Sequence, residues 1–353
     1  MAQQHLDPTD PTAGVVTGHA LEGYLRAQAT EFLRALRLHR ETGAAATAEE
    51  SVGAARALRR SARRISGSLH TFRPLLDADW SEEMRPELAW LSGTLGLEHA
   101  CEARLERLLL ALHRLSGSTA FPAQAIDPNG PGAGGRGVPA TAAPERGNLT
   151  VGAAKAGALL ERQLTLARTR AHSTALQALG SSRFHAVADK IAVLASEVPL
   201  TPAAATTELR PAAAAAEERL TAAIAGLPLV TAGHPYNAEA LIHGLSPDPS
   251  PHPQDGPWHQ VRLLLRLHRY AREVLLGPGA PVDVRLLAAG QALNRHRDAS
   301  EAAAAAAQAA RTPRIAPATA YALGVLHADQ RHEVEAARFA FQQSWQKQVV
   351  SAP

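Results

Sequence analysis

Two groups of basic residues share one spacing that suits the binding of an anion. His259, Arg262 and Arg266 lie at offsets of zero, three and seven, and Arg269 follows at offset ten. On a helix, residues at these offsets fall on one face and form a row about 15 Å long. Guanidinium groups stay charged and bind phosphate oxygens through paired N–H donors. The cations are therefore concentrated on a face that is expected to meet an anion.

The earlier group repeats this spacing in the first half of the chain. Arg56, Arg59 and Arg63 occupy the same three offsets, and Ser66 stands at offset ten. Arg60 and Arg64 widen the row. We define a first basic stripe, Arg56, Arg59, Arg60, Arg63 and Arg64, and a second basic stripe, His259, Arg262, Arg266 and Arg269. The two together are the predicted anion-binding residues, and their shared offsets indicate a duplicated helical unit.

The elements that carry these stripes are predicted to be helices, in an all-α protein. Hydrophobic residues make up 46% of the chain but aromatic residues only 4%, and Ala, Leu, Arg and Glu favour helices. An α/β fold, the second possibility, would need longer β-branched runs than the few residues found. The expected helices cover residues 17–40, 47–72, 79–96, 97–115, 152–179, 182–198, 211–227 and 258–276, one or two within 281–310, and a last one over 316–348.

Charge and cysteine content limit the class of protein. The net charge is +3 and the isoelectric point about 9.3, so anion binding must depend on where the charges lie rather than on their sum. A single cysteine, Cys101, rules out an internal disulfide framework. The polar N-terminus does not resemble a signal peptide, and no run reaches the ~20 apolar residues of a membrane span. We therefore expect a cytoplasmic protein that has no membrane partner.

Composition also predicts the domain organisation. Residues 1–14 are expected to form a disordered tail, and the Gly/Pro-rich segment 119–150 a linker. The linker separates a first helical half, 15–118, from a second, 151–350. Within 47–72 the residues Leu58, Ile65, Leu69 and Phe72 face away from the arginines and are expected in a core.

Several segments resemble the CHAD domain, the conserved histidine α-helical domain, over nearly the whole chain. They include "ALRRSARRISGSLHTFRPLLD", "LAWLSGTLG", "WHQVRLLLRLHRYA" and "ALNRHRDASEAA". The family signature is a histidine followed by basic residues at offsets of three, seven, eight and ten, once in each half. The resemblance implies two pseudo-two-fold-related four-helix bundles in one CHAD-type domain. It also implies basic faces that line a cleft and bind inorganic polyphosphate, and an association with polyphosphate granules.

This sequence departs from the family pattern at some positions. Arg56 stands where the first signature histidine is expected, and Ser66 and Leu267 replace basic residues. These losses leave open an alternative function, a helical scaffold that docks an acidic protein partner. Nucleic acid is a less suitable ligand, because few aromatic residues accompany the stripes. We found no catalytic motif, no metal-binding motif and no need for a cofactor, which predicts a non-enzymatic protein.

Overall fold

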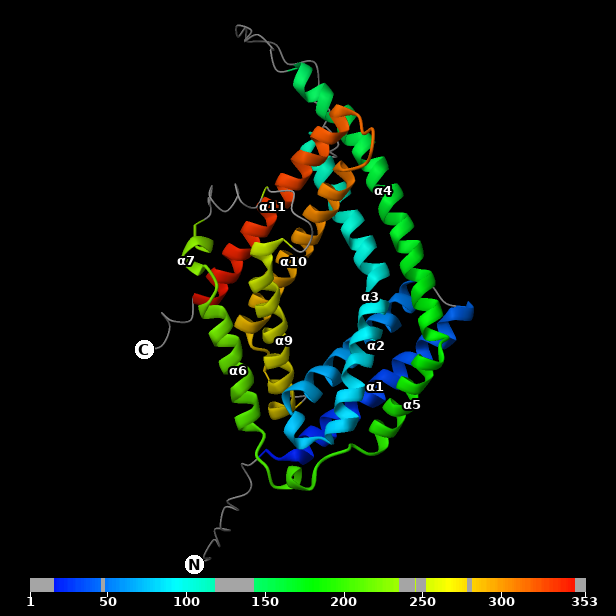
Figure 1. The fold of residues 1–353 in the computed structure, drawn as a ribbon, viewed down its shortest axis with the longest axis vertical. Helices are drawn as coiled ribbons and strands as arrows, with labels where there is room; N and C mark the ends of the chain where they lie inside the picture. The colour runs from blue at the N-terminus through cyan, green and yellow to red at the C-terminus, as the bar shows by residue number, and fades with distance from the viewer. Residues whose placement is uncertain are drawn as a thin grey trace, which may run out of the picture. The chain divides into compact units, whose positions relative to one another are not determined.

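The computed structural model describes residues 16–45, 48–117, 143–234, 245, 252–277 and 281–346 (Figure 1). Its long helices are α1 (Gly18–Ala45), α2 (Ala48–Thr71), α3 (Ala78–Leu115), α4 (Ala143–Leu179), α5 (Ser182–Ser196), α6 (Arg210–Ala225), α9 (Gly256–Leu276), α10 (Val284–Ala310) and α11 (Pro317–Gln346). Short turns of helix are η1 (Arg73–Leu75), η2 (Pro202–Ala205), α7 (Leu229–Ala232) and η3 (Pro253–Asp255). Within the described ranges there is no strand, only an isolated bridge between Leu76 and Leu200. The predicted all-α class is confirmed.

The chain divides into two compact units, which are described separately. Unit 1 comprises Met1–Leu97, Ala171–Leu227 and Gln260–Gly290, and unit 2 comprises Glu98–Arg170, Pro228–His259 and Gln291–Pro353. Helices α3, α4, α9 and α10 each contribute residues to both units. The predicted halves and their symmetry remain predictions. Residues 1–14 and most of the predicted linker lie outside the described ranges.

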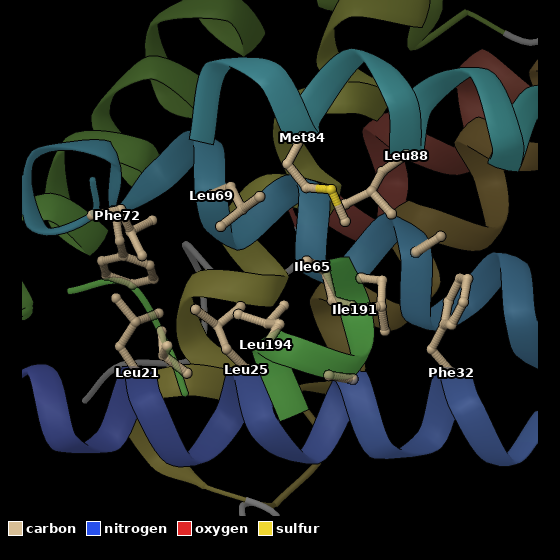
Figure 2. Packing of buried hydrophobic residues seen from close by; sticks show 14 of the residues in the cluster. Leu21, Leu25, Phe32, Ile65, Leu69, Phe72, Met84, Leu88, Ile191 and Leu194 are labelled. Carbon is tan, nitrogen blue, oxygen red and sulfur yellow. The ribbon is translucent and has the colours of Figure 1, made fainter. Parts of the chain in front are cut away.

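The core of unit 1 forms where α1 lies along α2 and α5 (Figure 2). Leucine and phenylalanine recur at helical spacing on one face of α1, as at Leu21, Leu25 and Phe32, and none of these side chains is exposed. The residues predicted to face a core from the second helix, Leu58, Ile65, Leu69 and Phe72, are all buried there. That burial fixes the rotation of α2 and turns its arginines away from the core.

The core of unit 2 is built mainly from small side chains. Seven of its thirteen residues are alanines, contributed by α3, α4, α10 and α11. Ala302, Ala306 and Ala309 come from the alanine-rich run of α10 and are completely buried. Small residues allow close approach of helix backbones: a Cβ added at Gly152 of α4 would lie 2.2 Å from the carbonyl oxygen of Ala318. The alanine run of α10 is thus part of the buried core of unit 2.

Three expectations about helix limits were wrong. The helices predicted over 79–96 and 97–115 are one continuous helix, α3. Gly93 and Gly96 weaken a helix by only about 1 kcal/mol each and supply no proline-like block, so the helix continues through them. Pro86 was expected to be tolerated only in the first turns of the helix predicted over 79–96, and it lies inside α3. Helix α4 begins at Ala143, before the predicted start at residue 152.

Candidate functional site

The first basic stripe lies on the side of α2 opposite the core of unit 1. Arg56 and Arg60 are exposed, whereas Arg59 and Arg63 are half-buried. The Nε of Arg59 donates to the carbonyl oxygen of Ser92 at 3.3 Å, so this side chain is held against α3. Its guanidinium occupies the space beside Gly96, where an added Cβ would come within 2.5 Å of Nη2.

The second basic stripe presents half-buried arginines along α9. Arg262, Arg266 and Arg269 have intermediate exposure, while Val261 and Leu265 beside them are buried. Among the described residues, neither Arg266 nor Arg269 has a hydrogen-bond or ion-pair partner, in contrast to Arg262. A half-buried cation without a partner has lost some hydration and gained nothing in exchange. Arg266 and Arg269 are therefore arginines of this stripe whose charge no described residue neutralises.

Helices α2 and α9 touch each other within unit 1. A Cβ added at Gly67 of α2 would lie 2.6 Å from the ring of Tyr270, so glycine permits this close approach. On the same side Arg64 makes two hydrogen bonds to Glu273, from Nε at 2.7 Å and from Nη2 at 3.3 Å. The hydroxyl of Tyr24 donates to the same carboxylate at 2.9 Å. Arg64 is therefore neutralised from within the protein.

This group of three is a coupled electrostatic cluster. Burial and the neighbouring Glu273 charge raise the pKa of Tyr24, which stays protonated as a donor. For Arg64, burial disfavours the charged form, but the hydrogen bonds and charge of Glu273 outweigh burial and the pKa is raised. The cluster joins α1, α2 and α9 through one carboxylate.

One pocket of unit 1 brings together a residue from each basic stripe. It has a volume of about 990 Å³, and both Arg64 and Arg269 line it. Its other charged side chains are Arg272, Glu273 and Asp283. The remaining predicted binding residues do not line this pocket. The structure thus places Arg64 and Arg269 at the same pocket. The other residues of both basic stripes lie outside it.

His259 lies in unit 2, where it contacts an aromatic group. The centroids of its ring and the ring of His296 are 5.5 Å apart, and the two rings are nearly perpendicular. His296 in turn stacks on Trp258 at 5.6 Å, and Phe341 meets the edge of Trp258 at 5.7 Å. His259 therefore packs beside a buried structural cluster as well as belonging to the second basic stripe.

A fully buried carboxylate, Asp255, organises that cluster. Arg331 Nη1 donates to Asp255 Oδ2 at 2.8 Å, and Arg338 Nη2 donates to Oδ1 at 2.7 Å. The hydroxyl of Ser300 donates to Oδ2 as well. Burial alone would raise the pKa of Asp255, but contacts with its basic neighbours His296 and Arg331 outweigh burial and lower it. Burial lowers the pKa of His296 to about 4, so its ring is neutral at neutral pH.

Comparison with known proteins identifies the family. The family model of the CHAD domain matches residues 27–307, which is most of the chain. The chain belongs to the CHAD-domain family. This confirms the resemblance drawn from the sequence segments.

Two solved structures are similar to this CHAD protein. PptA from Streptomyces chartreusis is 72% identical, with a TM-score of 0.77 over 94% of this chain and 99% of that one. The CHAD domain from the plant Ricinus communis is 16% identical, with a TM-score of 0.50 over 100% of this chain and 98% of that one. At that identity the second likeness concerns the fold alone. The search of curated proteins found no match.

The residues that sequence reasoning missed in this CHAD chain are acidic or aromatic. Glu273, Tyr24 and Asp255 carry the charge pairing described above, yet none belongs to a repeated spacing. Glu273 could have been noticed because it follows Arg269 by four positions on a basic helix.

In the described ranges, no group of three His, Cys, Asp or Glu residues could hold a metal ion. The same ranges contain no helix with the length and apolar character of a membrane span.

Proposed function

We propose that this CHAD protein binds inorganic polyphosphate through the arginines of α2 and α9 and catalyses no reaction. The observation that carries the proposal is the pair Arg266 and Arg269, half-buried on α9 with no partner among the described residues. Membership of the CHAD family supports it. The ligand's phosphates would supply the missing counter-charge.

The geometry of the stripes suits a chain of phosphates. Arg262, Arg266 and Arg269 lie on one face of α9, with a span of about 10 Å from first to last at 1.5 Å per residue. Polyphosphate carries about one negative charge for each repeating unit, so a row of guanidinium groups can neutralise successive phosphates. The arginines of the first basic stripe would extend the row from α2. His259 is proposed as a further donor to phosphate.

Binding to polyphosphate granules follows from the same chemistry. A granule presents many phosphates, so an affinity based on several ion pairs would keep the protein at its surface. We propose polyphosphate as the partner and the granule as one place where the protein meets it. The alternative, docking of an acidic protein, is an outcome that the following experiment distinguishes.

The test is titration of the full chain with long-chain polyphosphate at low and high salt. The double variant Arg262→Glu with Arg266→Glu is expected to lose at least about tenfold in affinity, since two attractive contacts become repulsive. The matched control is Lys155→Glu with Arg162→Glu. These two residues are exposed on one face of α4, and their replacement changes the net charge by the same amount.

Three results would contradict the proposal. They are no binding by the wild type at low salt, an unchanged affinity in the α9 variant, and an equal loss in the α4 control. RNA that displaces polyphosphate at equal phosphate concentration would point to nucleic acid instead. Recovery of an acidic protein on the α9 face, without any polyphosphate affinity, would favour the scaffold function.

A further inference from the structure

The pocket of about 990 Å³ in unit 1 has properties that polyphosphate binding does not explain. It lies among residues of α1, α9 and the start of α10, with Arg64 of α2. Its size is at the upper end of the range for small-molecule sites, about 300–1,000 Å³. More than half of its lining residues are apolar or glycine. A fully hydrated polyanion gains nothing from such a lining.

Apolar side chains are also exposed on the wall of this pocket. Leu276, Val282 and Leu287 all line it, and they are 53%, 72% and 39% exposed. Grouped exposed apolar residues at a concave surface are typical of a binding site. These three side chains would gain free energy if a hydrocarbon group covered them.

The charges of the pocket leave one cation uncompensated. Arg64 pairs with Glu273, and Arg272 pairs with Asp283. The hydroxyl of Tyr24 already donates a hydrogen bond to Glu273. Arg269 lines the same pocket with no partner among the described residues. Three arginines against two carboxylates therefore leave one positive charge, located on Arg269.

We propose that this pocket binds a small amphiphilic monoanion, a carboxylate with a hydrocarbon chain. The carboxylate would accept paired hydrogen bonds from Arg269, and the chain would cover Leu276, Val282 and Leu287. A phosphate monoester carries up to two negative charges, and its excess charge would face Glu273 and Asp283. This site is additional to the polyphosphate-binding face and shares only Arg64 and Arg269 with it.

Calorimetric titration of the full chain with octanoate tests the site. Octanoate is expected to bind saturably, with acetate at least about tenfold weaker because it lacks six methylene groups. Octanol, which lacks the charge, and octyl phosphate, which has excess charge, are expected to bind at least about fivefold more weakly than octanoate.

Two matched pairs of variants locate the ligand. Arg269→Gln should weaken octanoate binding by about tenfold, whereas Arg266→Gln, one turn earlier on α9 and outside the pocket, should leave it within about twofold. Val282→Asp should weaken binding similarly, and Val284→Asp should not. Val284 is equally exposed, at 75%, but does not line the pocket. Circular dichroism confirms that each variant is folded.

The site is overturned if octanoate shows no saturable binding, if octanol or octyl phosphate binds as tightly, or if Arg269→Gln and Val282→Asp behave like their controls. Polyphosphate titrations of the same variants separate the two sites. Arg266→Gln should weaken the binding of polyphosphate but not that of octanoate. A failure of one proposal therefore does not imply a failure of the other.

Discussion

Arg64 of α2 and Glu273 of α9 form a two-pronged ion pair, with N–O distances of 2.7 and 3.3 Å. The side chains are 25% and 30% exposed, so the pair is only partly hydrated. It joins two helices that each carry a basic stripe. It also neutralises one of the arginines expected to meet the ligand, so stability and anion binding compete at this position.

Replacement of Glu273 by Gln should separate these two effects. The change frees the guanidinium of Arg64, so we expect polyphosphate affinity to rise about threefold or more through one added contact. It should also lower the free energy of unfolding by about 1–2 kcal/mol, because Arg64 and Tyr24 lose a charged acceptor. Polyphosphate titration and urea unfolding measure the two changes.

Glu31→Gln on α1 is the control for that variant. It removes the same charge from an exposed pair, Glu31 with Arg34, and such pairs contribute about 0–1 kcal/mol. An unchanged polyphosphate affinity in Glu273→Gln would mean that Arg64 is not part of the binding face.

The salt dependence of binding should report the contact made by Arg266. By analogy with nucleic-acid phosphates, each ion pair contributes about 0.7–0.9 to the slope of log K against log salt concentration. Arg266→Gln should therefore reduce the magnitude of that slope by about 0.7–0.9, the contribution of one ion pair. Titration at several salt concentrations measures the slope. Arg162→Gln on α4 should leave the slope unchanged. Equal slopes for wild type and Arg266→Gln would remove Arg266 from the site.

Gly67 should be far less tolerant of alanine than Gly93. A Cβ at Gly67 would lie 2.6 Å from the ring of Tyr270, whereas nothing lies within 4 Å of one at Gly93. We expect Gly67→Ala to destabilise the protein by about 1–3 kcal/mol through overpacking between α2 and α9. Gly93→Ala should stabilise it by up to about 1 kcal/mol. Urea unfolding of both variants checks this, and equal effects would contradict the helix contact.

Stability should fall in mildly acidic solution because of His296. Burial lowers the pKa of His296 from 6.5 to about 4, so the unfolded chain takes up this proton at a higher pH than the native protein does. The free energy of unfolding therefore decreases from about pH 6.5 to pH 4, by up to about 3 kcal/mol from this group. Asp255, whose pKa is lowered, adds a decrease in the same direction as the pH falls below about 4.

His296→Gln tests this pH dependence. Between pH 7.5 and pH 4.5 the free energy of unfolding should decrease less in this variant than in the wild type. The difference between the two decreases should be about 2–3 kcal/mol. The pKa values of His70 and His268 are also lowered by burial, so the variant should retain part of the slope. His19→Gln, at a side chain that is 77% exposed, serves as control. Identical pH profiles for wild type and His296→Gln would refute the assignment.

Local pattern explains which parts of the fold were predictable. The buried face of α2, including Leu58 and Ile65, follows directly from helical spacing. The break predicted between residues 96 and 97 was wrong, because glycine only weakens a helix whereas packing on both sides sustains it. The overall all-α class depended on composition alone, and composition was sufficient.

The pairing of charges was not predictable from the sequence. Asp255 and Arg331 are 76 residues apart, and their contact depends on how α11 packs against the turn before α9. Likewise Arg64 meets Glu273 across 209 residues. A repeated spacing identifies the arginines that share a face, but only tertiary packing decides which of them a carboxylate neutralises. Arg266 and Arg269 could be distinguished from Arg64 only in the structure.

The alanine-rich core of unit 2 has a consequence for how that unit responds to temperature. Ala302, Ala306 and Ala309 each bring little apolar surface out of water, in contrast to the leucines and phenylalanines of unit 1. The heat capacity change of unfolding scales with the apolar surface that becomes exposed. Unit 2 is therefore expected to have the smaller heat capacity change per residue and the flatter stability curve, with less curvature toward both cold and hot denaturation.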